Sequence, residues 1–217
     1  MKLKHSGVIF DLDGTLVDTL EDIAVSMNRA LASRGFPELP SKEFLGKIGW
    51  GIKQLAWLSL PEDGKEAADL VALDAAHFYA EKPFIHSRIY PGILELLGSL
   101  KARKIKTAVL TNKPDPVAQK VIGALFPHDS FDYVRGEIKG GSRKPDPSCV
   151  WDLAVDLDLT PASIIFAGDS EIDMETAISS GCFPLGVSWG YRSSETLIKA
   201  GAKRIIDEAS ELMLFFD

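Results

Sequence analysis

Residues 7–19 read GVIFDLDGTLVDT and decide the fold, because an apolar run ends in two carboxylates one residue apart. The apolar run predicts a buried parallel strand over residues 8–10. Since side chains alternate along a strand, Asp11 and Asp13 then point to the same side where the strand ends. Two acids in one pocket repel each other unless a cation binds between them or one acid holds a proton. The alternative is a strand end with a solvated Asp-Gly turn.

The composition is that of a globular chain without a basic surface. Its 217 residues are 46% hydrophobic, which is enough for a core in one or two domains. The net charge is −7 and there is no basic run, so we expect no nucleic-acid partner. No apolar stretch approaches the roughly 18 residues of a membrane span, and the first residues do not read as a secretion signal. We expect a cytoplasmic protein without membrane contact, a monomer or weak homodimer, with Cys149 and Cys182 as free thiols.

From residue 90 onward, helical and strand patterns alternate. The pattern predicts strands over 106–110, near 133, and over 164–167, 184–187 and 204–206, with helices between them. Such alternation is typical of a parallel sheet with helices on both faces. Residues 17–85 instead show helical spacing that fits three or four helices. The predicted fold is α/β: a doubly wound, Rossmann-like parallel sheet from residues 1–16 and 86–217, with residues 17–85 inserted as a small α-helical cap.

Polar residues follow three other predicted strands, and ligands bind at the carboxyl ends of strands in such sheets. Thr111 and Asn112 precede a helix N-terminus, where backbone N–H groups can hold an anion, although both residues could simply cap that helix. Lys144 lies in a proline-stiffened loop, although a lone lysine is usually a surface residue. Asp169 and Asp173 stand one helical turn apart and could also be helix-dipole acids. Oxygen ligands without nearby His or Cys favour Mg²⁺ over zinc.

Taken together, these residues resemble the haloacid dehalogenase superfamily of hydrolases over essentially the whole chain. All four motifs of that superfamily occur in order: Asp11-Leu12-Asp13-Gly14-Thr15, Thr111-Asn112, Lys144-Pro145 and Gly168-Asp169 to Asp173. The helical insertion after the first strand is similar to the subgroup with a small helical C1 cap. Within that subgroup the chain resembles phosphoglycolate phosphatase-like proteins.

The resemblance implies a Mg²⁺-dependent phosphomonoester hydrolase that acts on a small phosphorylated metabolite, with 2-phosphoglycolate as the first candidate. It implies Asp11 as the nucleophile that forms an aspartyl-phosphate. It implies Asp13 as the general acid and then the general base. The metal is expected on the Asp11 carboxylate, the Asp13 main-chain carbonyl and Asp169, with Asp173 orienting a metal-bound water or the lysine.

The resemblance also implies that Thr111, Asn112 and Lys144 bind the phosphoryl oxygens. Specificity is expected to come from the cap. Because 2-phosphoglycolate carries a carboxylate, a cation or a helix N-terminus should face the pocket from the cap. The candidates are Lys47, Gly49, Gly51 and Lys53. The Gly49-Trp50-Gly51 segment could equally be a structural loop. Arg192 could touch the substrate or the cap, although a surface salt bridge is the simpler interpretation.

Several other functions stay open. An inorganic pyrophosphatase or a broad sugar-phosphate phosphatase would differ only in the cap. A β-phosphoglucomutase-like enzyme shares the four motifs but usually carries a cap histidine soon after the Asp-Thr pair, and residues 19–23 contain none. Asp13 disfavours carbon–halogen cleavage. The non-enzyme alternative is a phospho-aspartate switch similar to response-regulator receivers, which the helical insertion and Asp13 disfavour.

Overall fold

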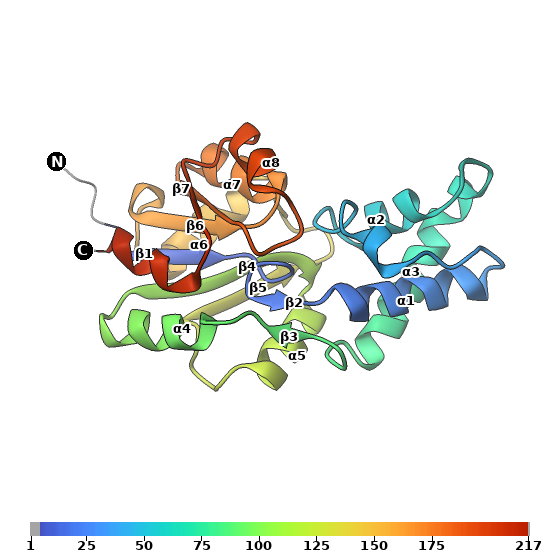
Figure 1. The fold of residues 1–217 in the computed structure, drawn as a ribbon, viewed down its shortest axis with the longest axis horizontal. Helices are drawn as coiled ribbons and strands as arrows, with labels where there is room; N and C mark the ends of the chain where they lie inside the picture. The colour runs from blue at the N-terminus through green and yellow to red at the C-terminus, as the bar shows by residue number, and fades with distance from the viewer. Residues whose placement is uncertain (1–4, 217) are drawn as a thin grey trace.

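The computed structural model describes residues 5–216, and within them six strands form one parallel sheet in the order β5-β4-β1-β6-β7-β8 (Figure 1). Every neighbouring pair of strands is parallel, which requires a crossover between consecutive strands. The α/β sheet predicted from the alternating pattern is therefore confirmed. The strands are β1 (Gly7–Phe10), β4 (Lys106–Pro114), β5 (Tyr133–Glu137), β6 (Ile164–Gly168), β7 (Phe183–Val187) and β8 (Arg204–Ile206).

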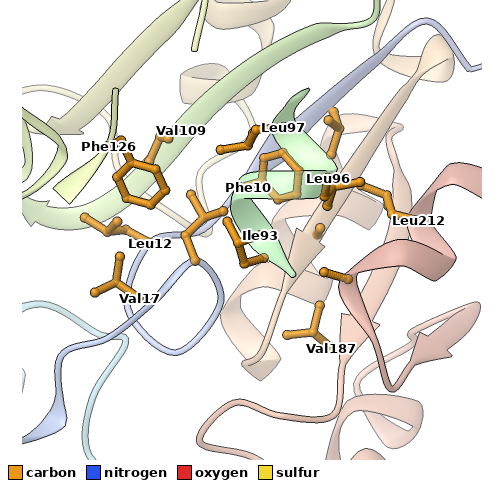
Figure 2. Close-up of a cluster of buried hydrophobic side chains, with 14 of the residues drawn as sticks. Phe10, Leu12, Val17, Ile93, Leu96, Leu97, Val109, Phe126, Val187 and Leu212 are labelled. Atoms are coloured by element: carbon orange, nitrogen blue, oxygen red, sulfur yellow. The ribbon is translucent and has the colours of Figure 1, made fainter. Parts of the chain in front are cut away.

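Helices cover both faces of this sheet. They are α4 (Ile93–Ala102), α5 (Asp115–Leu125), α6 (Ser148–Asp156), α7 (Glu171–Ser180) and α8 (Ser194–Lys199), with short 3₁₀ turns η3 (Pro161–Ser163) and η4 (Ala209–Phe215). Because side chains alternate along β1, Val8 and Phe10 pack with α4, α5 and η4, whereas Ile9 packs with α6 and α7. Figure 2 shows the first of these clusters, in which Phe10 lies among Ile93, Leu96 and Leu97. Burial on both faces explains the apolar run that opens the sequence.

The inserted segment forms a separate helical lobe beside the sheet (Figure 1). It contains α1 (Leu20–Ser33), α2 (Ile52–Ser59) and α3 (Ala68–Glu81), with 3₁₀ turns η1 (Ser41–Phe44) and η2 (Glu62–Ala67). These elements share their own buried cluster, which includes Met27, Leu31 and Phe44. The expected insert of residues 17–85 begins at β2 (Val17–Asp18) and ends shortly before β3 (Arg88–Ile89).

Two short connections join the lobe to the sheet. β2 and β3 pair as antiparallel strands where the chain leaves the sheet and returns to it. The buried carboxylate of Asp22 accepts hydrogen bonds from the backbone N–H groups of His86 and Ser87 and from the Ser87 hydroxyl. These bonds fix the first turn of α1 to the returning chain.

The structure differs from the sequence-based expectation in the length of β4. The pattern ended this strand at residue 110, but β4 continues to Pro114, which pairs with Glu137 across a register shift. Thr111, Asn112 and Lys113 therefore lie on the strand, and alternation places Thr111 and Lys113 on the same side. In the described part of the chain, residues 5–216, no helix is both long and apolar enough to cross a membrane.

The stability of the helical lobe depends on its own core, and a substitution of Phe44 tests this. The Phe44 ring is fully buried in the lobe cluster. We expect Phe44→Ala to lower the free energy of unfolding by about 3–5 kcal/mol, because it removes apolar contacts and leaves a cavity. Leu73→Ala, on the exposed side of α3 with 67% of Leu73 accessible, should change it by less than about 0.5 kcal/mol. Urea denaturation of both variants measures the difference, and equal losses would contradict a packed lobe core.

Candidate active site

The carboxyl ends of β1, β4 and β6 meet at one edge of the sheet, under the helical lobe. Asp11 comes directly after β1, and its backbone N–H donates to the Ala167 carbonyl of β6. Asp11, Asp13, Thr111, Asn112 and Lys144 line one pocket. The structure therefore brings together five residues that lie up to 133 positions apart in the sequence. The other wall of this pocket comes from the lobe, including both Gly49 and Gly51.

Three buried carboxylates form the floor of the site. Oxygens of Asp11, Asp169 and Asp173 lie within 4.8 Å of one another. The Lys144 ammonium lies 2.7 Å from Asp11 Oδ1 and 2.7 Å from Asp173 Oδ1. Burial opposes the charge of Lys144, but Asp11 and Asp173 outweigh that effect and raise its pKa. Lys144 is therefore a permanently charged, buried cation rather than the surface lysine that its type alone would suggest.

The same burial makes the acids hard to ionise. Burial raises the pKa of Asp11 well above its ordinary value, and Asp173, Asp169 and Asp13 add to that rise while Lys144 opposes it. Burial, with a further contribution from Asp173, raises the pKa of Asp169 to about 7. One ammonium thus faces three carboxylates in a buried site, so the cluster favours an additional cation.

Hydrogen bonds hold the acids in fixed orientations. Asp169 accepts from the Thr15 hydroxyl at 3.0 Å and from the Tyr191 N–H at 2.8 Å. Asp173 accepts from the N–H and the hydroxyl of Ser170, which is the N-cap of α7. A side chain at Gly190 would overlap Asp169, so only glycine lets the chain pass this close. Asp173 serves both as a helix-capping acid and as a wall of the cluster, so its two sequence-based interpretations do not exclude each other.

The cluster fits a divalent metal ion. Its donors are carboxylate oxygens, and Asp11 Oδ1 receives no hydrogen bond of suitable geometry although it is buried. Mg²⁺ prefers hard oxygen ligands of this kind. Asp11 and Asp169 are the predicted carboxylate ligands, and an oxygen of Asp173 also lies within 4.8 Å of theirs. The contribution expected from the Asp13 main-chain carbonyl stays a prediction.

The predicted phosphate-binding residues differ in how free their side chains are. Thr111 Oγ1 accepts from the Lys113 N–H at 3.2 Å, so its own hydroxyl proton can be donated into the pocket. The Asn112 amide is already engaged: its Nδ2 donates to the carbonyls of Gly49 and Lys144, and its Oδ1 accepts from the Lys144 N–H. Asn112 thus fixes the loop of Lys144 and one residue of the lobe. Its contact with a phosphoryl oxygen remains a prediction.

Lys113 and Tyr79 also line the pocket, and the sequence did not single them out. Lys113 Nζ lies 2.8 Å from Asp13 Oδ1 and donates to the Tyr79 hydroxyl at 2.6 Å. The same Asp13 oxygen accepts from the Thr19 hydroxyl at 2.6 Å. Alternation along β4 could have identified Lys113, because it follows Thr111 by two residues. Tyr79 carried no signal, since it reads as one more core position on an amphipathic helix.

The cap residues expected to carry specificity divide into two groups. Gly49 and Gly51 line the pocket. The two lysines are not among its lining residues: Lys47 Nζ lies 5.7 Å from the centre of the Phe44 ring, and Lys53, 78% exposed, pairs with Asp69 at 3.3 Å. The expectation that a cap lysine faces the substrate therefore finds no support in the geometry. The segment that carries the glycines bends at positive φ, 120° at Gly49 and 82° at Gly51.

Arg192 contacts the lobe, as one of its two interpretations expected, and it also forms a salt bridge, although its side chain is mostly buried. Only 9% of its side chain is exposed. Its guanidinium donates to the carbonyls of Leu45, Gly46 and Ile48 and pairs with Glu171 at 3.0 Å. From the other side of the pocket, Arg143 donates to the Trp50 carbonyl at 3.1 Å. The segment 45–51 is thus held against the sheet edge through its own backbone.

The chain is similar to known hydrolases and phosphatases. A family model described as haloacid dehalogenase-like hydrolase matches residues 8–187. Phosphoglycolate phosphatases of Mannheimia succiniciproducens and Rhodospirillum rubrum are each 33% identical to this chain over 94% of its length. The aligned regions cover 95% of the first relative and 88% of the second. A crystal structure from Haemophilus somnus, described as a predicted phosphoglycolate phosphatase, superposes with a TM-score of 0.88 at 29% identity, covering 98% of both chains.

The Arg192 contacts predict a local change in flexibility. Arg192→Met keeps the length of the side chain but removes the hydrogen bonds that Arg192 donates to the carbonyls of Leu45, Gly46 and Ile48. We expect backbone amides in segment 45–51 to exchange at least about tenfold faster, because the segment loses hydrogen bonds that hold it against the sheet edge. Hydrogen–deuterium exchange followed by mass spectrometry measures this. Arg135→Met, which breaks the 2.6 Å ion pair with Asp156, is the matched control and should leave the exchange rates of segment 45–51 unchanged.

The acid cluster predicts how metal binding depends on pH. Because the pKa of Asp169 rises from 3.8 to about 7 on folding, the folded protein keeps a proton that the unfolded chain has released. The stability contributed by this group therefore falls as pH rises from 3.8 to about 7. We expect a divalent ion to replace the proton above that range.

We expect Mg²⁺ to raise the Tm by at least about 3 °C near pH 8 and by much less near pH 5.5. Differential scanning calorimetry with Mg²⁺ or EDTA measures both conditions. Asp169→Asn, which cannot ionise, should lose the Mg²⁺-dependent part at both pH values. An equal rise at both pH values in the unmodified protein would contradict binding through these carboxylates.

Proposed function

This chain belongs to the haloacid dehalogenase-like hydrolases and is a phosphatase, and we propose that it hydrolyses a small phosphorylated metabolite, 2-phosphoglycolate above all, with Mg²⁺ through an aspartyl-phosphate. The observation that carries the proposal is the arrangement at the end of β1. Asp11, one of the three clustered acids, lies in ion-pair contact with Lys144, and Asp13 lines the same pocket. The phosphoglycolate phosphatases similar to this chain support the choice of substrate.

In the first step, an Asp11 oxygen attacks phosphorus and the bond from phosphorus to the substrate's ester oxygen breaks. Asp13 gives its proton to the departing oxygen, which leaves as an alcohol. Lys144 and the Thr111 hydroxyl bind phosphoryl oxygens, where negative charge gathers in the transition state. A bound Mg²⁺ would neutralise the repulsion between the acids and the phosphoryl group.

In the second step, water hydrolyses the phosphorylated Asp11. Asp13, now a carboxylate, accepts a proton from the attacking water, and the bond between the Asp11 oxygen and phosphorus breaks. Phosphate leaves and Asp11 returns to its starting form. The Thr19 hydroxyl holds Asp13 Oδ1 at 2.6 Å, which keeps this acid oriented through both steps. Asp173 and Lys144 hold each other at 2.7 Å and so fix the ammonium beside Asp11.

The pocket lining that comes from the lobe favours a small substrate. We propose that residues 17–85 act as a cap over a catalytic core made by residues 1–16 and 86–217. Most of the pocket surface that comes from the lobe is apolar: Ile23, Ile48, Ile52 and Leu55. A sugar phosphate would leave several hydroxyls against this surface without hydrogen-bond partners, which is costly. A short phosphorylated acid has no such hydroxyls, so the lining favours it over a sugar phosphate.

Replacing the nucleophile tests the chemistry. Asp11→Asn keeps the size of the side chain but removes its nucleophilic oxygen charge, and we expect phosphate release to fall at least about 10³-fold. Asp152→Asn, at an exposed acid on α6, is the matched control and should keep the activity of the unmodified protein. The assay follows phosphate release from 2-phosphoglycolate, pyrophosphate, sugar phosphates and an aryl phosphate, with Mg²⁺ or with EDTA.

The outcomes separate the alternatives. Mg²⁺-dependent release that is highest with 2-phosphoglycolate supports the whole proposal. Highest release with pyrophosphate or a sugar phosphate would contradict the substrate but keep the mechanism. A stable phosphorylated Asp11 without turnover would contradict hydrolysis and favour a phospho-aspartate switch.

A further inference from the structure

We propose that Lys113, positioned by Tyr79, is a carboxylate-binding group that makes this site selective for phosphorylated carboxylic acids. This inference rests on the proposed phosphatase function and names the group that would choose its substrate. Lys113 comes from β4 of the sheet domain, whereas Tyr79 comes from α3 of the lobe. The pair therefore joins the two parts of the molecule across the pocket.

Lys113 is a buried cation in a pocket wall. Only 2% of its side chain is exposed, and it lines the same pocket as Asp11 and Asp13. A buried ammonium is costly unless charged or polar groups surround it, so its presence there needs a partner. In the structure that partner is Asp13, at 2.8 Å, with the Tyr79 hydroxyl at 2.6 Å. The Tyr79 ring adds a cation–π contact at 4.3 Å.

The partners of Lys113 leave room for a ligand. An ammonium has three N–H donors. Among residues 5–216, Asp13 and the Tyr79 hydroxyl are its polar side-chain partners, so one donor remains for a third group. Of the described residues that line the pocket, the other cation is Lys144, which already binds Asp11 and Asp173. Lys113 is therefore the cation that can serve a second anionic group of a substrate.

The position of Lys113 matches the chemistry of such a substrate. Asp13 protonates the ester oxygen in the proposed first step, so that oxygen must lie against the Asp13 carboxyl. In 2-phosphoglycolate the carboxylate carbon is separated from this oxygen by one methylene group. Lys113 contacts the same Asp13 carboxyl, so its ammonium lies where a carboxylate so close to the ester oxygen would reach it. Lys144 lies on the phosphoryl side, 2.7 Å from Asp11.

The lobe offers no competing cation at the pocket. The lobe side chains there are apolar except for Tyr79, and the two lysines expected from the sequence, Lys47 and Lys53, are outside the described lining. The carboxylate would therefore be bound by a group of the sheet domain that the lobe covers and desolvates. Desolvation strengthens such a charged hydrogen bond, because less water competes for either partner.

The experiment compares two ligands that differ in the carboxylate alone and cannot be hydrolysed at a P–O–C bond. 3-Phosphonopropionate mimics 2-phosphoglycolate with a methylene in place of the ester oxygen, and propylphosphonate replaces its carboxylate with a methyl group. We expect the unmodified protein with Mg²⁺ to bind 3-phosphonopropionate about 10- to 100-fold more tightly than propylphosphonate. Isothermal titration calorimetry measures both dissociation constants.

Lys113→Met tests the residue itself. We expect this variant to bind the two phosphonates with affinities within about threefold of each other, because methionine has no donor for the carboxylate. Tyr79→Phe keeps the cation but frees it from its anchor, and should reduce the preference by about 3- to 10-fold. Lys199→Met, at an exposed lysine of α8 that pairs with Glu195, is the matched control and should keep the full preference.

Two results would overturn the inference. The first is equal binding of the two phosphonates by the unmodified protein, which does not depend on whether any variant folds. The second is a Lys113→Met variant that loses affinity for both ligands equally, since that would make Lys113 only a partner of Asp13. Failure of the phosphatase proposal would look different: 3-phosphonopropionate would be preferred, yet no phosphate would be released from any phosphate ester.

Discussion

The contact on which the site depends is the ion pair of Lys144 with Asp11 and Asp173. Each carboxylate lies 2.7 Å from the ammonium, and all three groups are almost fully buried. Without the cation, the acids would repel one another at low dielectric and would have to take up protons. With it, Asp11 stays next to a positive charge at the end of β1, where an anionic substrate can approach. Breaking a buried pair of this kind costs more than forming it gains, so the position of each partner is tightly constrained.

The rest of the fold serves to bring these groups to one place and keep water out. Parallel strands end at the same edge of the sheet, so β1, β4 and β6 deliver their polar residues to a common point. The lobe then closes over that point through backbone carbonyls of residues 45–50, which Arg192, Asn112 and Arg143 bind from the sheet side. Because these bonds go to the backbone, the side chains of the lobe are left free to shape the pocket.

Much of the site was predictable because its residues lie in short segments with recognisable local patterns. Asp11, Asp13, Thr111 and Asp169 each follow a strand signal, and Lys144 lies in a loop that two prolines mark in the sequence. Among the specificity candidates, Gly49 and Gly51 line the pocket, whereas Lys47 and Lys53, which were included for their charge, are not among its lining residues. An exposed lysine such as Lys53 is stable in water, so its side chain need not enter the pocket. The sequence pattern does not show which of these two orientations a lysine adopts. The sequence left open whether Arg192 contacts the cap or forms a surface salt bridge, because most of its partners are backbone carbonyls that no sequence motif marks.

The sequence by itself determined the parallel α/β sheet, the helical insertion and the set of acids at the strand ends. These follow from local periods of apolar residues and from the order of elements, which need no knowledge of distant contacts. Only the tertiary structure decided that β4 extends through Lys113, that Tyr79 of the lobe meets that lysine, and that Asn112 binds the lobe and the loop of Lys144. Each of these depends on two segments far apart in the chain coming within hydrogen-bond distance. That proximity is set by the packing of the whole molecule, and no local pattern encodes it.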